Sequence, residues 1–271
     1  MVEDAGVDGF TSSSYGDAFA DVYDSWYEHL DHVPTVVAAL ARLAGDAGRV
    51  LELGVGTGRL AVPLATLLTK GGGRVTGIDA SAAMLARLAA NDPAGLVVAA
   101  CGDMVDELPD GPFDVVLVAY NTLFNLLDAS RQVQCVAAAA QRLAHGGVLV
   151  IEAFVPDEQA RSRRDDIGVR SLRADEVVLS ISRTAPDDQR VEGQYVSISE
   201  AGGVRLRPWA IRWSTPPQID AMAAAAGLAR IARWGSLAAD PFDEHSPRHV
   251  SLYAPTGDVA EASARVRNLL G

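Results

Sequence analysis

Short apolar runs alternate with segments of helical character between about residues 49 and 154, and this alternation constrains the fold more than any other feature. The runs are of the kind shown by strands buried on both faces: RVLELG (49–54), RVTGID (74–79), LVVAAC (96–101), FDVVLVAY (113–120) and VLVIEAF (148–154). Helix-like segments lie near 58–70, 81–90 and 130–144. Strands separated by crossover helices predict an α/β fold with a doubly wound, mostly parallel sheet.

A different pattern follows Pro156. Period-two alternation of apolar and polar residues predicts strands near 169–183, 190–200 and 203–213, with turn-forming residues between them. We assign residues 165–214 to an antiparallel β insertion. A helix near 216–226, strands near 228–235 and 248–254, and a last helix at 258–270 follow. The two late strands would complete a seven-stranded sheet, so we expect a single domain over residues 1–271.

The N-terminal segment has its own periodicity. From Tyr15 to Leu30, apolar and aromatic residues recur at three- and four-residue spacings, which predicts one amphipathic helix. A second helix is predicted from Pro34 to Ala44, where Gly45 ends it. Together these helices make an N-terminal helical segment over 14–44.

Charge and composition limit the classes of partner that this protein is expected to bind. The net charge is −12, from 35 acidic against 23 basic residues, so the average surface repels phosphate backbones and anionic lipids. We therefore expect no nucleic-acid and no membrane partner, and homo-oligomerisation stays open. The N-terminus is acidic where a signal peptide is positive, and no apolar stretch reaches the roughly 18 residues of a membrane span, which predicts a cytoplasmic protein.

Two cysteines lie in apolar segments. Cys101 and Cys135 are predicted to be buried free thiols, and no CxxC pair or Cys/His cluster is present to hold zinc, so no metal is expected.

The segment VLELGVGTGRL (50–60) carries the strongest chemical signal, a buried strand that enters a glycine turn and then a helix. Such turns bind a cofactor at the carboxyl end of the first strand. The spacing places glycines at 54, 56 and 58, whereas the dinucleotide fingerprint has its last glycine where this chain has Arg59. Glu52 before the turn suits an ammonium group and would repel a pyrophosphate. These details favour S-adenosylmethionine (SAM) over NAD.

Two further carboxylates fit a nucleoside. Asp79 ends the second predicted strand, where a carboxylate accepts from both ribose hydroxyls. The alternative role for Asp79 is a helix cap, which Ser81 fills better. Asp103 follows the third strand and is placed to accept from the adenine amino group, with a solvated loop carboxylate as the alternative.

In these motifs the chain resembles the class I SAM-dependent methyltransferases. The matching segments are Glu52–Gly58, Asp79, Gly102–Met104 and Leu143–Gly147, in the family's order, although His145 stands where proline is more usual and is taken as a solvated turn residue. The resemblance implies a Rossmann-like doubly wound seven-stranded sheet. It also implies cofactor contacts from Tyr23, Glu52, Gly54, Gly56, Thr57, Gly58, Asp79, Ala80, Met84, Gly102, Asp103, Met104 and Ala119.

A second resemblance is to small-molecule N-methyltransferases of bacterial secondary metabolism, of the amino-sugar and lincosamide type. It rests on Tyr15 and Tyr23 eight residues apart, on the segment Asn121–Asn125, and on the β insertion. It implies that the N-terminal helix is a lid over SAM and that the insertion lies over the substrate site. The catalytic residues it implies are Tyr15, Tyr23, Asn121 and Phe124, the alternatives being a plain packing helix and a core phenylalanine.

The expected activity is methyl transfer from SAM to a small-molecule acceptor, an amine of a secondary metabolite, with S-adenosylhomocysteine (SAH) as product. An amine needs alignment and desolvation more than a strong base, and Glu152 is a further candidate to take its proton. One alternative is an O-methyltransferase with His245 or His249 as base. Another is a SAM-binding cyclase that transfers no methyl. Trp209 and Trp213 either wall the acceptor site or pin the insertion to the sheet.

Overall fold

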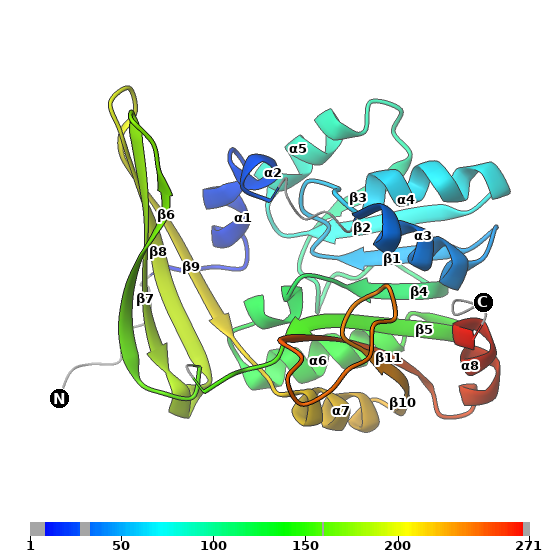
Figure 1. Ribbon diagram of the computed structural model, residues 1–271. Helices are drawn as coiled ribbons and strands as arrows, with labels where there is room; N and C mark the ends of the chain where they lie inside the picture. Colours follow the sequence, from blue (N-terminus) through cyan, green and yellow to red (C-terminus); the bar gives the residue numbers. More distant parts are fainter. Residues whose placement is uncertain (1–8, 28–32, 159, 268–271) are drawn as a thin grey trace.

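The computed structural model describes residues 9–27, 33–158 and 160–267, and is built on one seven-stranded mixed sheet (Figure 1). The strand order is β10-β11-β5-β4-β1-β2-β3, in which the first five strands along the chain pair in parallel and β11 and β10 are antiparallel. The strands are β1 Arg49–Leu53, β2 Arg74–Asp79, β3 Val97–Cys101, β4 Phe113–Val118, β5 Leu143–Phe154, β10 Leu228–Trp234 and β11 Arg248–Pro255. This architecture confirms the doubly wound sheet predicted from the sequence.

Helices cover both faces of the sheet, which explains the unbroken apolar runs. In β4, Val115 and Leu117 face one hydrophobic core, while Val116 and Val118 face the other. The first core is covered by α3 (Val33–Ala44), α4 (Ala61–Leu68), α5 (Ala82–Asn91) and α8 (Val259–Arg267), and the second by α6 (Ala129–Ala140) and α7 (Pro216–Ala225). A strand buried on two sides is mostly apolar along its length rather than alternating.

The sheet order reverses between β1 and β4, and this reversal positions the site. In open α/β sheets the crevice for a ligand opens at such a point, beyond the carboxyl ends of the strands. One boundary prediction here was wrong: α6 ends at Ala140, and β5 begins at Leu143, so the predicted helix over 130–144 runs too far. His145 lies in β5, exposed, with its ring nitrogens 2.9 Å from carboxylates of Asp258 and Glu261.

A separate antiparallel sheet of four strands stands away from the main sheet (Figure 1). Along the chain it lies between β5 and α7. Its strands are β6 Arg164–Leu172, β7 Glu176–Ala185, β8 Arg190–Ser199 and β9 Gly203–Arg212. The segment predicted as one strand over 169–183 is in fact two, because the chain turns at Arg173–Asp175. Arg173 N–H donates to the Glu176 carbonyl there, in a turn that contains neither Gly nor Pro.

Two short helices replace the single N-terminal helix that was predicted. They are α1 (Ser14–Phe19) and α2 (Tyr23–Trp26), and the rest of that prediction, 28–32, lies outside the described residues. Asp21, in the break between them, is bound by Arg207 (Nη1 to Oδ1, 2.6 Å) and Arg205 (Nη1 to Oδ2, 2.9 Å) of β9. α1 therefore lies between the insertion sheet and α5 (Figure 1).

The two cysteines differ in exposure. Cys135 is buried in α6, as predicted, but Cys101 is exposed, which corrects the second half of that prediction. Cys101 ends β3, the edge strand of the main sheet, so fewer neighbours cover it. Within the described residues, no helix is both long and apolar enough to cross a membrane.

Candidate active site

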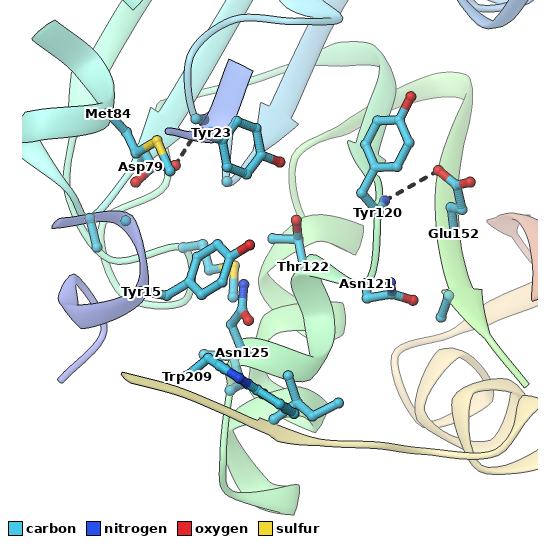
Figure 2. A pocket seen from close by; sticks show the side chains of 18 of the residues that line it. Tyr15, Tyr23, Asp79, Met84, Tyr120, Asn121, Thr122, Asn125, Glu152 and Trp209 are labelled. Carbon is cyan, nitrogen blue, oxygen red and sulfur yellow. Dashed lines mark hydrogen bonds between the residues drawn. The ribbon is translucent and has the colours of Figure 1, made fainter. Parts of the chain in front are cut away.

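A cavity of about 660 Å³ opens at the carboxyl ends of β1, β4 and β5 (Figure 2). Its walls come from four sources: the N-terminal helices, the glycine turn with the end of β2, the loops after β4 and β5, and the inner face of the insertion. The lining includes Tyr15, Tyr23, Tyr27, Gly54, Gly56, Arg59, Asp79, Ala80, Met84, Asp103, Met104, Tyr120, Asn121, Thr122, Asn125, Glu152, Tyr195, Trp209 and Arg248.

The glycines of the turn after β1 have different surroundings. All three have positive φ, at +68° for Gly54, +55° for Gly56 and +81° for Gly58. A Cβ at Gly58 would crowd Val62 and Leu88, so this glycine lets α4 and α5 pack closely. A Cβ at Gly56 would instead point into open space, with no atom within 4 Å. Gly56 is thus where a ligand can approach the backbone.

Asp79 at the end of β2 stiffens this turn. Its Oδ2 accepts from Gly56 N–H and its Oδ1 from Ser81 N–H, both at 2.9 Å. Each carboxylate oxygen can accept more than one bond, so both retain capacity for a ligand in the cavity. Burial raises the pKa of Asp79, and the two backbone N–H groups oppose that rise. Ser81, not Asp79, caps α5, since its hydroxyl accepts from Met84 N–H at 3.1 Å.

Glu52 is a buried carboxylate with an open hydrogen-bonding position. Its side chain is 5% exposed, and in the part of the chain that the structure describes Oε2 has no hydrogen-bond partner. Burial raises the pKa of Glu52 to about 8, with Asp79 adding to the rise and Arg59 opposing it. A buried acceptor without a donor costs free energy, so this atom suits a donor supplied by a ligand.

Aromatic side chains surround the Arg59 guanidinium on the side of the cavity formed by the N-terminal helices. The Arg59 guanidinium lies 4.1 Å from the centroid of the Tyr120 ring and 5.5 Å from that of Tyr23. Burial raises the pKa of Tyr15 and raises that of Tyr23 to about 12. Both phenols are therefore neutral at ordinary pH and can donate or accept hydrogen bonds without acting as bases. Figure 2 shows their hydroxyls directed into the same space.

The loop after β4 faces Glu152 of β5. Tyr120 and Asn121 have φ of +49° and +65°, a conformation that is uncommon outside glycine and that clusters at functional sites. Tyr120 N–H donates to Glu152 Oε2 at 3.2 Å, as drawn in Figure 2, and Asn121 Oδ1 accepts from Phe154 N–H at 2.7 Å. Burial raises the pKa of Glu152, while the Tyr120 N–H, Arg248 and Arg59 oppose the rise.

Polar contacts dock the N-terminal helices over the glycine turn. Asp24 of α2 accepts from the Thr57 hydroxyl at 2.6 Å and from Asn91 at 3.2 Å. Asp17 of α1 accepts from the Ser81 hydroxyl at 2.6 Å. A Cβ on Gly16 would overlap Ser81, so α1 approaches α5 as closely as a glycine allows.

The cavity brings together most of the predicted site residues. Ten of them line it: Tyr15, Tyr23, Gly54, Gly56, Asp79, Ala80, Met84, Asp103, Met104 and Asn121. Glu52, Thr57, Gly58, Gly102 and Ala119 are not among the residues that line it. The placement predicted for Phe124 beside the acceptor was wrong: it is fully buried and packs edge-on against Phe154, with centroids 5.1 Å apart.

Asp103 lines the cavity, and part of its hydrogen-bonding capacity is taken by other residues of the chain. Its Oδ1 accepts from Arg131 at 2.7 Å and from Val105 N–H at 2.8 Å. Its role toward adenine stays a prediction.

Several lining residues were missed from the sequence. Arg59 follows the glycine turn, and Tyr120 follows the end of β4. Polar residues at such positions are candidates for the site on the motif alone. Tyr195 and Arg248 come from β8 and β11, and no local pattern marks them. The two tryptophans lie in different places. Trp209 lines the cavity, whereas Trp213 is buried in the core.

The doubly wound sheet and the glycine turn, with Glu52 and Asp79 beside it, are the features by which the sequence resembled the class I methyltransferases. A methyltransferase-domain family model matches residues 50–147. The cypemycin N-terminal methyltransferase of a Streptomyces species is 30% identical over 204 residues, 74% of this chain and 80% of that protein. The chain belongs to the class I SAM-dependent methyltransferases and is a SAM-dependent enzyme.

Two solved structures show the same architecture over nearly the full chain. The CcbJ methyltransferase from Streptomyces caelestis is 35% identical, with a TM-score of 0.83 over 91% of this chain and 99% of that one. The SAM-bound amino pentose methyltransferase CalS10 from Micromonospora echinaspora, involved in calicheamicin biosynthesis, is 26% identical, with a TM-score of 0.63 over 92% of this chain and 99% of that one.

Proposed function

We propose that this enzyme methylates an amine nitrogen of a small natural product. The observation that carries the proposal is Glu152, a half-buried carboxylate near the end of β5 that lines the cavity opposite Tyr15 and Tyr23. A carboxylate held there by Tyr120 N–H can bind an ammonium group and take up its proton. The named relatives support it, since the cypemycin enzyme acts on an N-terminus and CalS10 on an amino pentose.

The cofactor contacts follow from charge and hydrogen-bonding capacity. Asp79 offers both oxygens to the ribose hydroxyls, and Gly56 leaves room for backbone approach. Glu52 Oε2, which lacks a donor among the described residues, suits the ammonium group of the amino acid moiety. Arg59, held over Tyr120, suits its carboxylate.

Bound SAM supplies an electrophilic methyl group on a sulfonium centre. The chain's part is to align the acceptor, exclude water and hold a proton. Tyr15 and Tyr23 direct neutral hydroxyls into the cavity, where they orient the amine, and their rings favour a positive charge nearby. Glu152 accepts the proton that the ammonium form of the acceptor must lose before its lone pair can attack. In this scheme residues 14–44 form a lid and residues 165–214 cover the acceptor.

Trp209 gives the acceptor site one more polar contact. Its ring lies against Gly193, where a Cβ would overlap the ring atoms, and its indole Nε1 has no acceptor among the described residues. A buried N–H donor beside an apolar surface suits an acceptor molecule with a hydroxyl or carbonyl oxygen.

An O-methyltransferase would need a firmer base than these groups provide. The two histidines considered for that role lie outside the cavity lining. His245 is exposed, while His249 is buried, within 2.8 Å of the Ser251 hydroxyl, and burial lowers its pKa to about 4. The arrangement therefore favours an amine acceptor.

The test is a turnover assay with SAM carrying a 13C-labelled methyl group. Amino sugars, secondary amines and peptide N-termini are offered beside hydroxyl analogues of matched size, and SAH and methylated products are measured by mass spectrometry and NMR. We expect N–13CH3 signals from the amines only. Glu152→Gln should lower turnover while SAH affinity stays unchanged, and exposed Glu200→Gln serves as control. Methyl signals on oxygen would contradict the proposal, and cofactor binding without SAH formation from any acceptor would favour the cyclase.

A further inference from the structure

The cavity contains one guanidinium group without a partner among the described residues. The charged residues that line it are Arg59, Asp79, Asp103, Glu152 and Arg248. The first four are held by hydrogen bonds or aromatic rings of the chain. In the part of the chain that the structure describes, the Arg248 guanidinium forms no hydrogen bond and no ion pair. This cation is therefore available to a ligand.

The register of two strands places Arg248 beside Glu152. In the antiparallel pairing of β11 with β5, Arg248 lies opposite Phe154 and Val250 lies opposite Glu152. Arg248 and Glu152 are thus diagonal neighbours on one face of the sheet, with Cβ atoms about 7 Å apart. His249 and Val250, which follow on β11, are fully buried, so the strand fixes the position of Arg248.

Electrostatics agree that the Arg248 guanidinium faces this corner of the cavity. Burial raises the pKa of Glu152 and that of Tyr120, and Arg248 is among the charges that oppose both rises. Arg248 and Glu152 nevertheless form no ion pair, although both are half-buried and both line the cavity. The two side chains therefore offer opposite charges to one ligand.

We propose that Arg248 binds a carboxylate of the acceptor molecule whose amine nitrogen lies at Glu152. The inference rests on the proposed amine acceptor and narrows it to amines that carry a carboxylate, as amino acids do. A guanidinium binds a carboxylate through two parallel N–H···O bonds, which fixes orientation as well as position. With such an acceptor bound, both charges at this corner of the cavity are paired.

The charge of the cavity favours a carboxylate over a phosphate. A carboxylate brings one negative charge, whereas a phosphate monoester brings nearly two at pH 7. Among the described residues, the other cation of the lining is Arg59, which we assign to the cofactor, and Asp79 and Asp103 add negative charge. One guanidinium therefore balances a carboxylate and leaves a phosphate with uncompensated charge.

Apolar side chains indicate the rest of the acceptor. Leu126, Phe154, Trp209, Ile211 and Pro247 also line the cavity. Walls of this kind bind a hydrocarbon skeleton, while the few polar groups fix its orientation. We therefore expect an amino acid with an apolar side chain to be a better acceptor than a polar amine.

The first experiment compares free amino acids with their amides as acceptors. Proline, valine and phenylalanine are offered with SAM beside their carboxamides, and SAH formation is measured. In wild type, kcat/KM for each acid should exceed that for its amide by about 10-fold or more. Arg248→Gln should remove this preference, mainly through a higher KM for the acids, and Arg248→Lys should restore part of it.

The variants separate the carboxylate contact from amine basicity, which amidation also changes. Both Arg248 variants should bind SAH with wild-type affinity, because Arg248 faces the acceptor. The matched control is Arg74→Gln, since Arg74 is an exposed arginine at the start of β2, at the end of the sheet away from the cavity. This control should keep the preference for acids.

A binding experiment tests Arg248 without methyl transfer. Phenylacetate, phenylacetamide and benzylphosphonate are titrated into SAH-saturated protein and followed by NMR. Phenylacetate should bind wild type about 10-fold more tightly than it binds Arg248→Gln, and more tightly than phenylacetamide binds wild type. Such binding without methylation of any amine would support the carboxylate contact and reject the proposed amine acceptor.

Other outcomes would reject the carboxylate contact and keep the amine acceptor. Equal methylation of acids and amides by wild type is one such outcome, and an acid preference that survives in Arg248→Gln is another. Undetectable binding of phenylacetate, or tighter binding of benzylphosphonate than of phenylacetate, would also overturn the proposal.

Discussion

Replacement of Glu52 by Gln tests the proposed contact between Glu52 and the ammonium group of the cofactor. The contact is detected by the proton that Glu52 releases when the cofactor binds. Glu52 is 5% exposed and burial raises its pKa to about 8, from 4.5 for the free side chain. A shift of about 3.5 units corresponds to about 5 kcal/mol that favours the neutral form in the folded protein. Without cofactor, about 0.9 of the molecules carry this proton at pH 7 and about 0.1 at pH 9.

An ammonium group placed against Glu52 favours the ionised carboxylate, so binding should release the proton. The expected release from Glu52 is about 0.9 protons per SAH at pH 7 and about 0.1 at pH 9. The assay is calorimetry of SAH binding in buffers of different ionisation enthalpy. Because the amino group of SAH titrates in the same range, the Glu52→Gln variant provides the baseline to subtract. Equal proton release by wild type and Glu52→Gln at pH 7 would refute the contact.

The same group predicts how stability depends on pH. The folded state holds a proton on Glu52 that the unfolded chain loses above pH 4.5, so the unfolding free energy falls as pH rises toward 8. Glu52→Gln removes this dependence, and the cofactor-free variant should unfold at a higher temperature than wild type at pH 8 and above.

The remaining predictions concern single side chains. Asp79→Ala should weaken SAH binding by about 100-fold or more, because two charge-assisted bonds to the ribose are lost at about 1.5–3 kcal/mol each; calorimetry measures it. Gly56→Val fills the open space beside the turn and should abolish SAH binding while circular dichroism shows the fold retained; normal binding would remove the site assignment. Tyr23→Phe should lower kcat by about 10-fold or more with SAH affinity unchanged, and wild-type kinetics would make Tyr23 a packing residue.

The parts of the fold that were predicted correctly are those that local sequence determines. Strands buried on both faces are mostly apolar, so β1, β2 and β4 were identified close to their observed bounds. The break between α1 and α2 was missed because apolar spacing continues through it. At the break, Asp21 is bound by Arg205 and Arg207, which lie far along the chain and cannot be paired with it from local sequence.

The candidate site divides in the same way. The half that we propose for the cofactor comes from one strand, turn and helix and from the end of the next strand, and local sequence identifies residues such as Gly56 and Asp79 there. The half that we propose for the acceptor is assembled from separate elements, including Trp209 on β9 and Arg248 on β11. Phe124 shows the limit in detail, since a residue beside Asn125 on the 3-10 turn η2 (Thr122–Asn125) can face either the cavity or the core.

A crystal structure with SAH and an amine inhibitor tests the central claim most directly. It should show the ribose hydroxyls on the Asp79 carboxylate, the amino group at Glu52, and the sulfur facing the space between Tyr15 and Glu152. SAH bound outside this cavity, or with its sulfur turned away from Glu152, would contradict the account.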